Sequence, residues 1–124
     1  KYSREHMLML VFIYYFKNIL SINDIQTLLE PLARDFFPGE GTMDLTDLYK
    51  EIMELELAQI EPLAKDVTKK FGLAWDSFQD AAPQEQEFLR KFAFICMLSF
   101  DVYVKKQVIE NLIDQMSEKE KEKK

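Results

Sequence analysis

The sequence predicts an all-α protein, a compact helical bundle of about five helices with two central apolar helices. Few turns are available, because only 3 glycines and 4 prolines occur among 124 residues. No stretch of useful length alternates apolar and polar residues as a half-buried strand would. Residues 7–16 and 92–98 are almost entirely apolar. Helices that are apolar all round are usually buried, so we expect these two segments to pack against each other at the centre of the bundle.

The first two helices carry start signals. Ser3 is a candidate N-cap of a helix over residues 4–17, and Glu5 places a carboxylate in its first turn. Ser21 is the candidate N-cap of a second helix, with Asp24 three residues later. Its apolar stripe consists of Ile22, Ile25, Leu28 and Leu29. The apolar run at residues 7–16 is too short to cross a bilayer, which takes roughly 20 residues.

Prolines and glycines mark the middle of the chain. Pro31 is expected to end the second helix or to open a further turn, because the residue before a proline is disfavoured in the α conformation. Residues 38–42 form the clearest loop. A long helical pattern starts at Asp44, and Pro62 predicts a kink or two abutting helices near residues 58–61. We expect this helix to end just before Gly72, because glycine is common directly after the last residue of a helix.

The last helix is expected from about Pro83 to about Met116. Cys96 lies in its most apolar segment, where we expect the thiol to be buried and inert. Residues 117–124 contain no apolar residue, which predicts a disordered, charged tail. Residues 1–116 would then form a single helical domain.

Composition restricts the function. The formal net charge is -6, and such a chain is a poor binder of nucleic acid by itself. A single cysteine fits a reducing, cytoplasmic location, and no membrane partner is expected. His6 is the one histidine, and no Glu-x-x-His pair accompanies it. We therefore predict no metal site, no cofactor, no catalytic residues and no enzymatic activity.

Residues near the N-terminus resemble a known pattern. The segment Tyr2-Ser3-Arg4-Glu5-His6, the apolar helix, and then LSINDI and LL at residues 20–25 and 28–29 resemble the second half of a MerR-type DNA-binding domain. The segment is closer still to an uncharacterised bacterial family, whose members join a MerR-like segment to a helical domain of unknown function. The similarity covers residues 1–29, about a quarter of the chain.

The resemblance implies a transcription regulator. Residues 1–30 would be the second half of the DNA-binding domain, and residues 31–116 a helical region for dimerisation or signal sensing. DNA would be bound only through an N-terminal helix-turn-helix that is missing from this chain, with Lys1 and Arg4 as candidate contacts to the DNA backbone. Members of the wider MerR class dimerise through a helix, so a homodimer is expected. Its candidate seam is Val104, Val108, Leu112 and Met116.

An alternative function is the binding of an apolar small molecule, without any role connected to DNA. Helical bundles rich in aromatic residues can hold such ligands between their helices, and this chain has 10 Phe and 5 Tyr. A small-molecule effector of a regulator would use the same kind of space. The candidate lining residues are Phe12, Tyr15, Trp75, Phe92, Phe100 and Tyr103.

Overall fold

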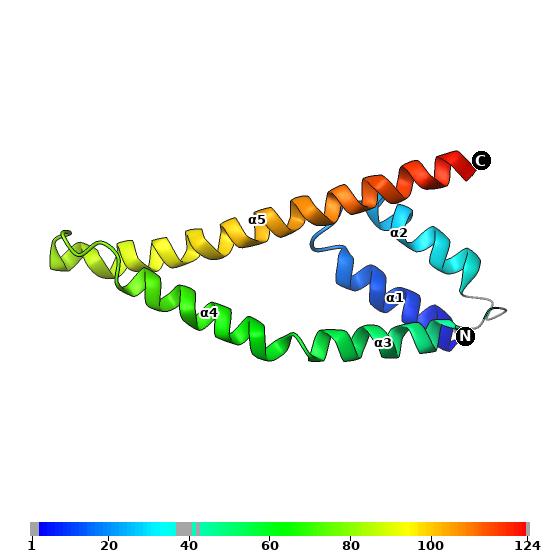
Figure 1. Cartoon of the computed structure of the whole chain (residues 1–124), viewed down its shortest axis with the longest axis horizontal. Helices are drawn as coiled ribbons and strands as arrows, with labels where there is room; N and C mark the ends of the chain where they lie inside the picture. Colours follow the sequence, from blue (N-terminus) through cyan, green and yellow to red (C-terminus); the bar gives the residue numbers. More distant parts are fainter. Residues whose placement is uncertain (1–2, 37–40, 42, 124) are drawn as a thin grey trace. The chain divides into compact units, whose positions relative to one another are not determined.

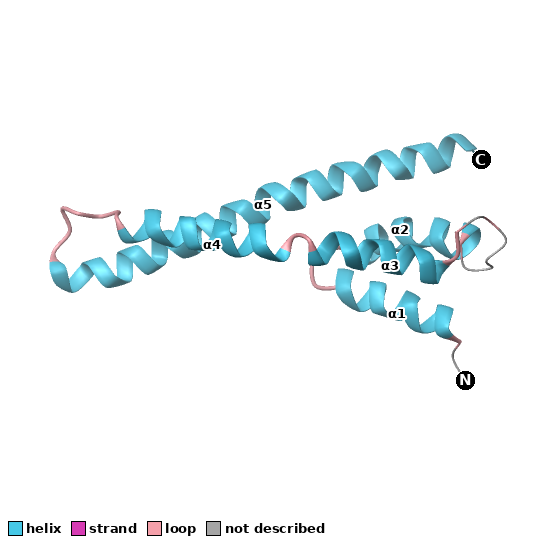
Figure 2. Cartoon of the chain, turned by 60° about the horizontal axis from the view of Figure 1, so that its bottom comes forward, coloured by secondary structure: helices cyan, strands magenta, loops and turns pink. Residues whose placement is uncertain are grey.

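The computed structural model describes residues 3–36, 41 and 43–123. In these residues the chain forms five α-helices and no strand, so the all-α prediction is confirmed (Figures 1 and 2). The helices are α1 (Arg4–Phe16), α2 (Ile22–Asp35), α3 (Leu45–Leu57), α4 (Ile60–Trp75) and α5 (Pro83–Lys123). They divide into two compact units, the first made of Lys1–Leu55 and Lys106–Lys124, the second of Glu56–Lys105.

Both predicted N-caps in the first unit are confirmed. The Ser3 hydroxyl accepts the backbone N–H of His6 at 3.3 Å, and the Ser21 hydroxyl accepts that of Asp24 at 3.1 Å. Each bond satisfies one of the N–H groups that a helix start leaves without a partner inside the helix. Between the two helices, the backbone N–H of Leu20 donates to the carbonyl of Phe16 at 2.8 Å. Local hydrogen bonds therefore fix where α1 ends and α2 begins.

The core of the first unit draws on α1, α2, α5 and the turn between the first two. Its buried residues are Phe12, Leu20, Ile25, Leu29 and Ile113. From α3, the Tyr49 ring packs edge-on against the Phe12 ring, with 6.1 Å between the centroids. Removing a buried Phe or Leu side chain usually costs about 2–5 kcal/mol, so this small cluster holds the four helices of the unit together.

Pro31 lies inside α2 and does not end it, contrary to expectation. Proline lacks an N–H and costs a helix interior about 3 kcal/mol. Leu29, two residues before Pro31, is buried in the core. Leu28, before the proline, and Leu32, directly after it, pack on the same core. This burial offsets the cost of the proline. The predicted loop at residues 38–42 lies, apart from Gly41, outside the described residues.

The second unit begins with the predicted break. α3 ends at Leu57 and α4 begins at Ile60, which places Pro62 in a first turn where its missing N–H costs no intrahelical bond. Gly72 does not end α4, which continues to Trp75. A glycine costs a helix only about 1 kcal/mol. Packing holds the last turn in place, because Ala74 is buried.

The connection from α4 to α5 is held by side chains from α5. The Gln86 amide lies within 3.3 Å of the carbonyls of Phe78 and Gln79, and 3.2 Å from that of Ala81. Phe78 has a φ of 56°, in the left-handed region. Hydrogen bonds from the side chain of Gln86 to the surrounding carbonyls stabilise this conformation.

α5 is longer than predicted. It continues to Lys123, where the sequence predicts a disordered tail after residue 116. Glu and Lys are good helix formers, and extending an existing helix requires no new nucleation. Glu120 also accepts hydrogen bonds from Arg34, which ties this end of α5 to α2.

The two apolar segments are not buried as expected. In residues 7–16 only Phe12 is buried, while Tyr14 and Tyr15 are more than half exposed. In residues 92–98, Phe92 and Ile95 are more than half exposed, and Cys96 is exposed as well. The two segments belong to different units. A helix that is apolar on all sides needs neighbours on all sides to bury it, and neither unit supplies them.

Candidate functional site

The start of α1 carries the residues of the predicted DNA-backbone contact. Arg4 is exposed in the first turn of α1. Lys1 lies outside the described residues. Next to Arg4, the Ser3 hydroxyl is 2.7 Å from Nδ1 of His6, which fixes that ring against the cap. Of the two predicted contacts, Arg4 lies among the described residues, and its contact with DNA stays a prediction.

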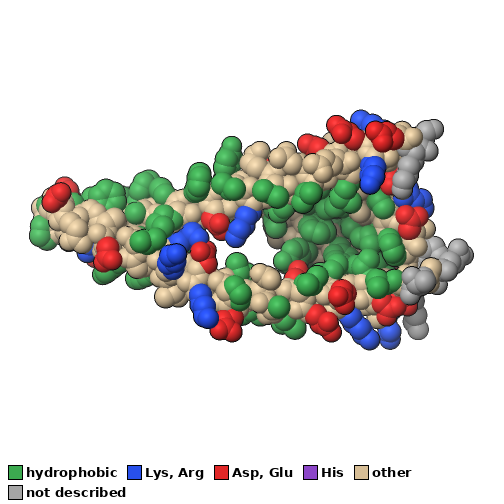
Figure 3. Space-filling model, in the orientation of Figure 1, with side chains coloured by type: hydrophobic (Ala, Val, Ile, Leu, Met, Phe, Trp, Pro, Cys, Tyr) green, Lys and Arg blue, Asp and Glu red, His purple; other side chains and the backbone are tan. Residues whose placement is uncertain are grey.

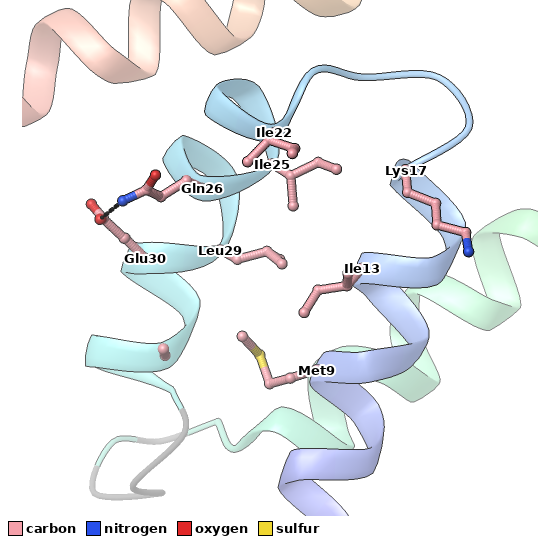
Figure 4. Close-up of a pocket in the computed structure, with 9 residues that line it drawn as sticks. Met9, Ile13, Lys17, Ile22, Ile25, Gln26, Leu29 and Glu30 are labelled. Atoms are coloured by element: carbon pink, nitrogen blue, oxygen red, sulfur yellow. Dashed lines mark hydrogen bonds between the residues drawn. The ribbon is translucent and has the colours of Figure 1, made fainter.

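A groove of about 500 Å³ separates α1 from α2 in the first unit (Figure 4). Met9 and Ile13 of α1 face Leu29 of α2 across it. The full lining is Met9, Ile13, Lys17, Ile22, Ile25, Gln26, Leu29, Glu30 and Ala33. The heptad-like spacing of Ile22, Ile25 and Leu29 is visible in the sequence, but the sequence does not show which apolar stripes stay uncovered.

The polar groups around this groove are engaged with their own neighbours. The Gln26 amide donates to the Glu30 carboxylate at 3.0 Å. The ammonium of Lys17 lies over the ring of Tyr14, 4.6 Å from the centroid, and away from the groove (Figure 4). The groove therefore offers apolar surface, without a polar side chain directed into it from these three positions.

The six aromatic residues predicted to line a pocket fall in two different units. Phe12 and Tyr15 belong to the first, where Phe12 is buried in the core and Tyr15 is 55% exposed. The others belong to the second unit and are 46–67% exposed: Trp75, Phe92, Phe100 and Tyr103. The groove in the first unit is lined by none of the six.

The predicted dimer seam lies on α5 and is open to solvent. Val108 and Leu112 are 53% and 54% exposed, and Val104 and Met116 are 42% and 40% exposed. A repeat of four residues turns by about 40° at each step, because an α-helix advances about 100° per residue. The seam therefore winds around α5, and it brings no more than two or three of its members onto one straight face.

Three ion pairs shift the pKa values of their own groups. Asp35 and Glu120 both hydrogen-bond the Arg34 guanidinium and raise its pKa further above its usual range, Asp35 more strongly. In the second unit, the hydrogen bond from Lys70 lowers the pKa of Asp66, and the same bond raises that of Lys70. All three pairs join residues of helices: Arg34 and Asp35 of α2, Glu120 of α5, and Asp66 and Lys70 of α4.

A metal site and a membrane span are both absent from the residues that the structure describes. No group of three or more His, Cys, Asp or Glu side chains is placed to hold a metal ion. No helix in the same part of the chain is long and apolar enough to span a membrane.

Comparison with known proteins gives one match, to the N-terminal part of the chain. Residues 1–52 match the family model of a domain of unknown function (DUF1836). This stretch contains α1, α2 and residues 45–52 of α3, and therefore both walls of the groove. No curated protein and no solved structure matches the chain. The match covers the segment whose residues carry the resemblance described above, and it extends beyond it.

Proposed function

We propose that this chain is the helical self-association part of a transcription regulator with a MerR-like DNA-binding segment, and that it acts as a homodimer. The observation that carries the proposal is the open apolar surface of α5, where the four seam residues are 40–54% exposed. Exposed apolar side chains that share one face of a helix often mark a protein interface, and two or three of the four seam residues share such a face.

The connection to DNA rests on the N-terminal residues. Arg4 is exposed at the start of α1, where an arginine can contact a phosphate. The chain has a net charge of -6, so its own attraction to DNA is weak. Sequence would be read by a helix-turn-helix elsewhere in a longer protein, and the helices described here would set the spacing of two such readers.

Light scattering after gel filtration tests the homodimer. At tens of micromolar the chain should have twice its mass of 14.7 kDa. A strict monomer at this concentration would contradict the proposal. The connection to DNA is tested with promoter fragments at 0.15 M salt. The longer protein should bind tightly and this chain weakly, and tight, sequence-specific binding by this chain alone would contradict the charge argument.

A second candidate function is the binding of an apolar small molecule in the groove between α1 and α2. Its volume of about 500 Å³ falls in the range of known ligand sites, and its walls are mainly Ile, Leu and Met. A thermal-shift screen with medium-chain alcohols tests it. Ligands should raise the melting temperature of the wild type, and Ala33→Phe, which fills the groove, should abolish the shift. No shift with any ligand would exclude this function for that class.

A further inference from the structure

We propose that residues 110–123 of α5 act as a strap, which closes the core of the first unit and opens separately from the rest of that unit. One buried apolar residue and one charged contact hold the strap, so its opening responds to salt. The inference goes beyond the proposed function, because it concerns how a single chain closes its own core.

The side of the strap that meets the first unit is identified by burial. Ile113 is 2% exposed, and Glu110, Ser117 and Glu120 are partly buried. These four residues follow one another at spacings of three, four and three, and at about 100° per residue they fall within an arc of roughly 80°. The other residues from 111 to 122 are exposed. The strap therefore meets the unit with this one side.

The docked side of the strap has little apolar surface. Ile113 is the one apolar residue among the four, and it joins Phe12, Leu20, Ile25 and Leu29 in the buried cluster. Burying one aliphatic side chain favours the docked state by roughly ten- to a hundredfold. After residue 116 the sequence supplies no further apolar residue. On this basis the open strap makes up on the order of 1–10% of the molecules.

The charged contact of the strap can be given up at little cost. Glu120 accepts from both amino groups of Arg34, at 3.1 and 3.2 Å. Asp35, the next residue in α2, accepts two further hydrogen bonds of 3.0 Å from the same guanidinium. When Glu120 leaves, Arg34 keeps the carboxylate of Asp35. Exposed charge pairs are also weakened by salt, so salt favours the open strap.

The last turns of the strap depend on this contact. Residues 118–123 alternate between Glu and Lys. Figure 3 shows charged side chains of both signs gathered at this end of α5. The alternation places like charges four residues apart, as in Glu118 and Glu122, which disfavours a helix. The contact with α2 therefore helps to keep the end of α5 helical.

Opening of the strap affects the segment that matches the family model. The four other buried residues of the cluster lie within residues 1–52, whereas Ile113 lies outside this stretch. A distant part of the chain thus completes the core of the matched segment. Ile25 and Leu29 of the same cluster also line the groove between α1 and α2 (Figure 4). An open strap therefore loosens one wall of the groove.

The test measures how fast a single thiol reacts with a disulfide reagent in the full chain carrying Cys96→Ser. Ile113→Cys reports the open strap, because a buried thiol reacts only when it is uncovered. Gln115→Cys, on the exposed side of the strap, gives the rate without protection. Ile113→Cys should react roughly ten- to a hundredfold more slowly than Gln115→Cys at 1 μM. The ratio should be the same at 50 μM.

The charged contact is tested by two matched substitutions in the chain with Ile113→Cys. Glu120→Gln should raise the reaction rate roughly two- to fivefold at low salt. Glu118→Gln removes the same charge from an exposed position and should leave the rate unchanged. Going from 0.05 to 0.5 M NaCl should speed the reaction by a similar factor, but hardly at all after Glu120→Gln. An unchanged rate after Glu120→Gln would overturn the salt response.

The apolar contact is tested by adding to it in the chain with Ile113→Cys. Ser117→Leu brings a second apolar side chain to the docked side and should slow the reaction at least about threefold. Asn111→Leu is the control, because it adds the same kind of side chain on the exposed side of the strap. It should leave the rate unchanged. Equal effects of the two substitutions would contradict the assigned docking side.

The remaining outcomes separate the strap from the proposed function. Equal rates for Ile113→Cys and Gln115→Cys would show that the strap is not docked. A rate that rises with urea as steeply as global unfolding would show that the core opens only as a whole. Either result overturns the inference. If Ile113→Cys loses helical circular dichroism, Ser117→Cys on the same side replaces it and is read in the same way.

The dependence on concentration distinguishes the strap from the homodimer. Protection that is present at 50 μM but lost at 1 μM would assign the cover of Ile113 to a second chain. It would overturn the strap and leave the homodimer standing. Protection in a chain that stays monomeric at both concentrations would support the strap and contradict the homodimer.

Discussion

Arg34 and Glu120 are 86 residues apart in sequence and form a two-point ion pair in the first unit. The two amino groups of the guanidinium donate to the two carboxylate oxygens at 3.1 and 3.2 Å. Such a fork geometry is specific to arginine, because a lysine ammonium is a point charge. The pair joins the last turn of α2 to the last turns of α5. It therefore supplies a reason for α5 to stay helical where the sequence predicts a tail.

The ion pair can be tested with a double-mutant cycle. Arg34→Gln and Glu120→Gln should each lower the urea midpoint of unfolding slightly, and the double substitution should cost less than the sum of the two. Arg34→Lys should recover only part of the loss, because it keeps the charge but not the fork. The coupling should shrink in 0.5 M NaCl, which screens exposed charges. Additive effects at low salt would show that the pair does not stabilise the protein.

The N-cap of α2 should be a local source of stability. Ser21→Ala removes the acceptor for the backbone N–H of Asp24 and should lower the free energy of unfolding by about 1 kcal/mol. Ser21→Asp keeps an acceptor at this position and is the matched control, for which we expect little change. Urea titrations followed by circular dichroism measure both. Equal losses for the two variants would point to a role of Ser21 other than capping.

Gly72 should be replaceable with a gain in stability. A Cβ at this position would meet no atom within 4 Å, and the residue lies inside α4. Gly72→Ala should raise the free energy of unfolding by up to about 1 kcal/mol, because alanine loses less backbone freedom in a helix. Gly72→Ser should give a smaller gain, in line with its lower helix propensity. Destabilisation by both would show that α4 needs glycine here.

The pair of Asp66 and Lys70 predicts a pH dependence with a defined sign. The hydrogen bond from Lys70 lowers the pKa of Asp66 in the folded state. The pair therefore stabilises the folded protein fully at a pH above the pKa that Asp66 has in the unfolded chain. This stabilisation is lost as the pH falls through the pKa of Asp66 in the folded protein. The pKa of Lys70 is raised in the folded state. Its contribution to stability is therefore complete at a pH below its pKa in the unfolded chain, and it is lost as the pH rises through its pKa in the folded protein.

Urea midpoints between pH 2 and pH 7 measure the acidic arm of this dependence. Asp66→Asn should lower the urea midpoint at pH 7, and the midpoint of this variant should fall less steeply between pH 5 and pH 2 than that of the wild type. Glu61→Gln is the control, since it removes the same charge from the exposed pair with Lys65 in the same helix. The same steep fall in Asp66→Asn as in the wild type would assign the acid sensitivity to other carboxylates.

Helix starts could be predicted from the sequence because their causes are local. Ser3 and Ser21 cap their helices with their own hydroxyls, and the break before Pro62 follows from proline geometry. Pro31 was expected to end its helix or to open a further turn, and Gly72 to follow the end of its helix. Both lie inside helices instead. At both positions, packing by residues close by in the same helix outweighs the local preference, and packing depends on partners that are distant in sequence.

Burial was the least predictable property. The sequence marks residues 7–16 and 92–98 as apolar, but it does not show how many neighbours surround them, and Ile95 and Cys96 are exposed. The groove between α1 and α2 was missed for the same reason. Ile25 and Leu29 belong to the predicted apolar stripe of the second helix and are buried in the core, yet they also form one wall of an open groove.

The small core of the second unit, in which Ala74 is the buried residue among those described, has a consequence for how the protein folds. With the proposed homodimer, part of the stabilisation comes only when two chains meet, so folding and assembly obey mass action together. Diluting the protein would then lower its melting temperature without any change in solvent. The amount of this protein present in a cell would itself decide how much of it is folded.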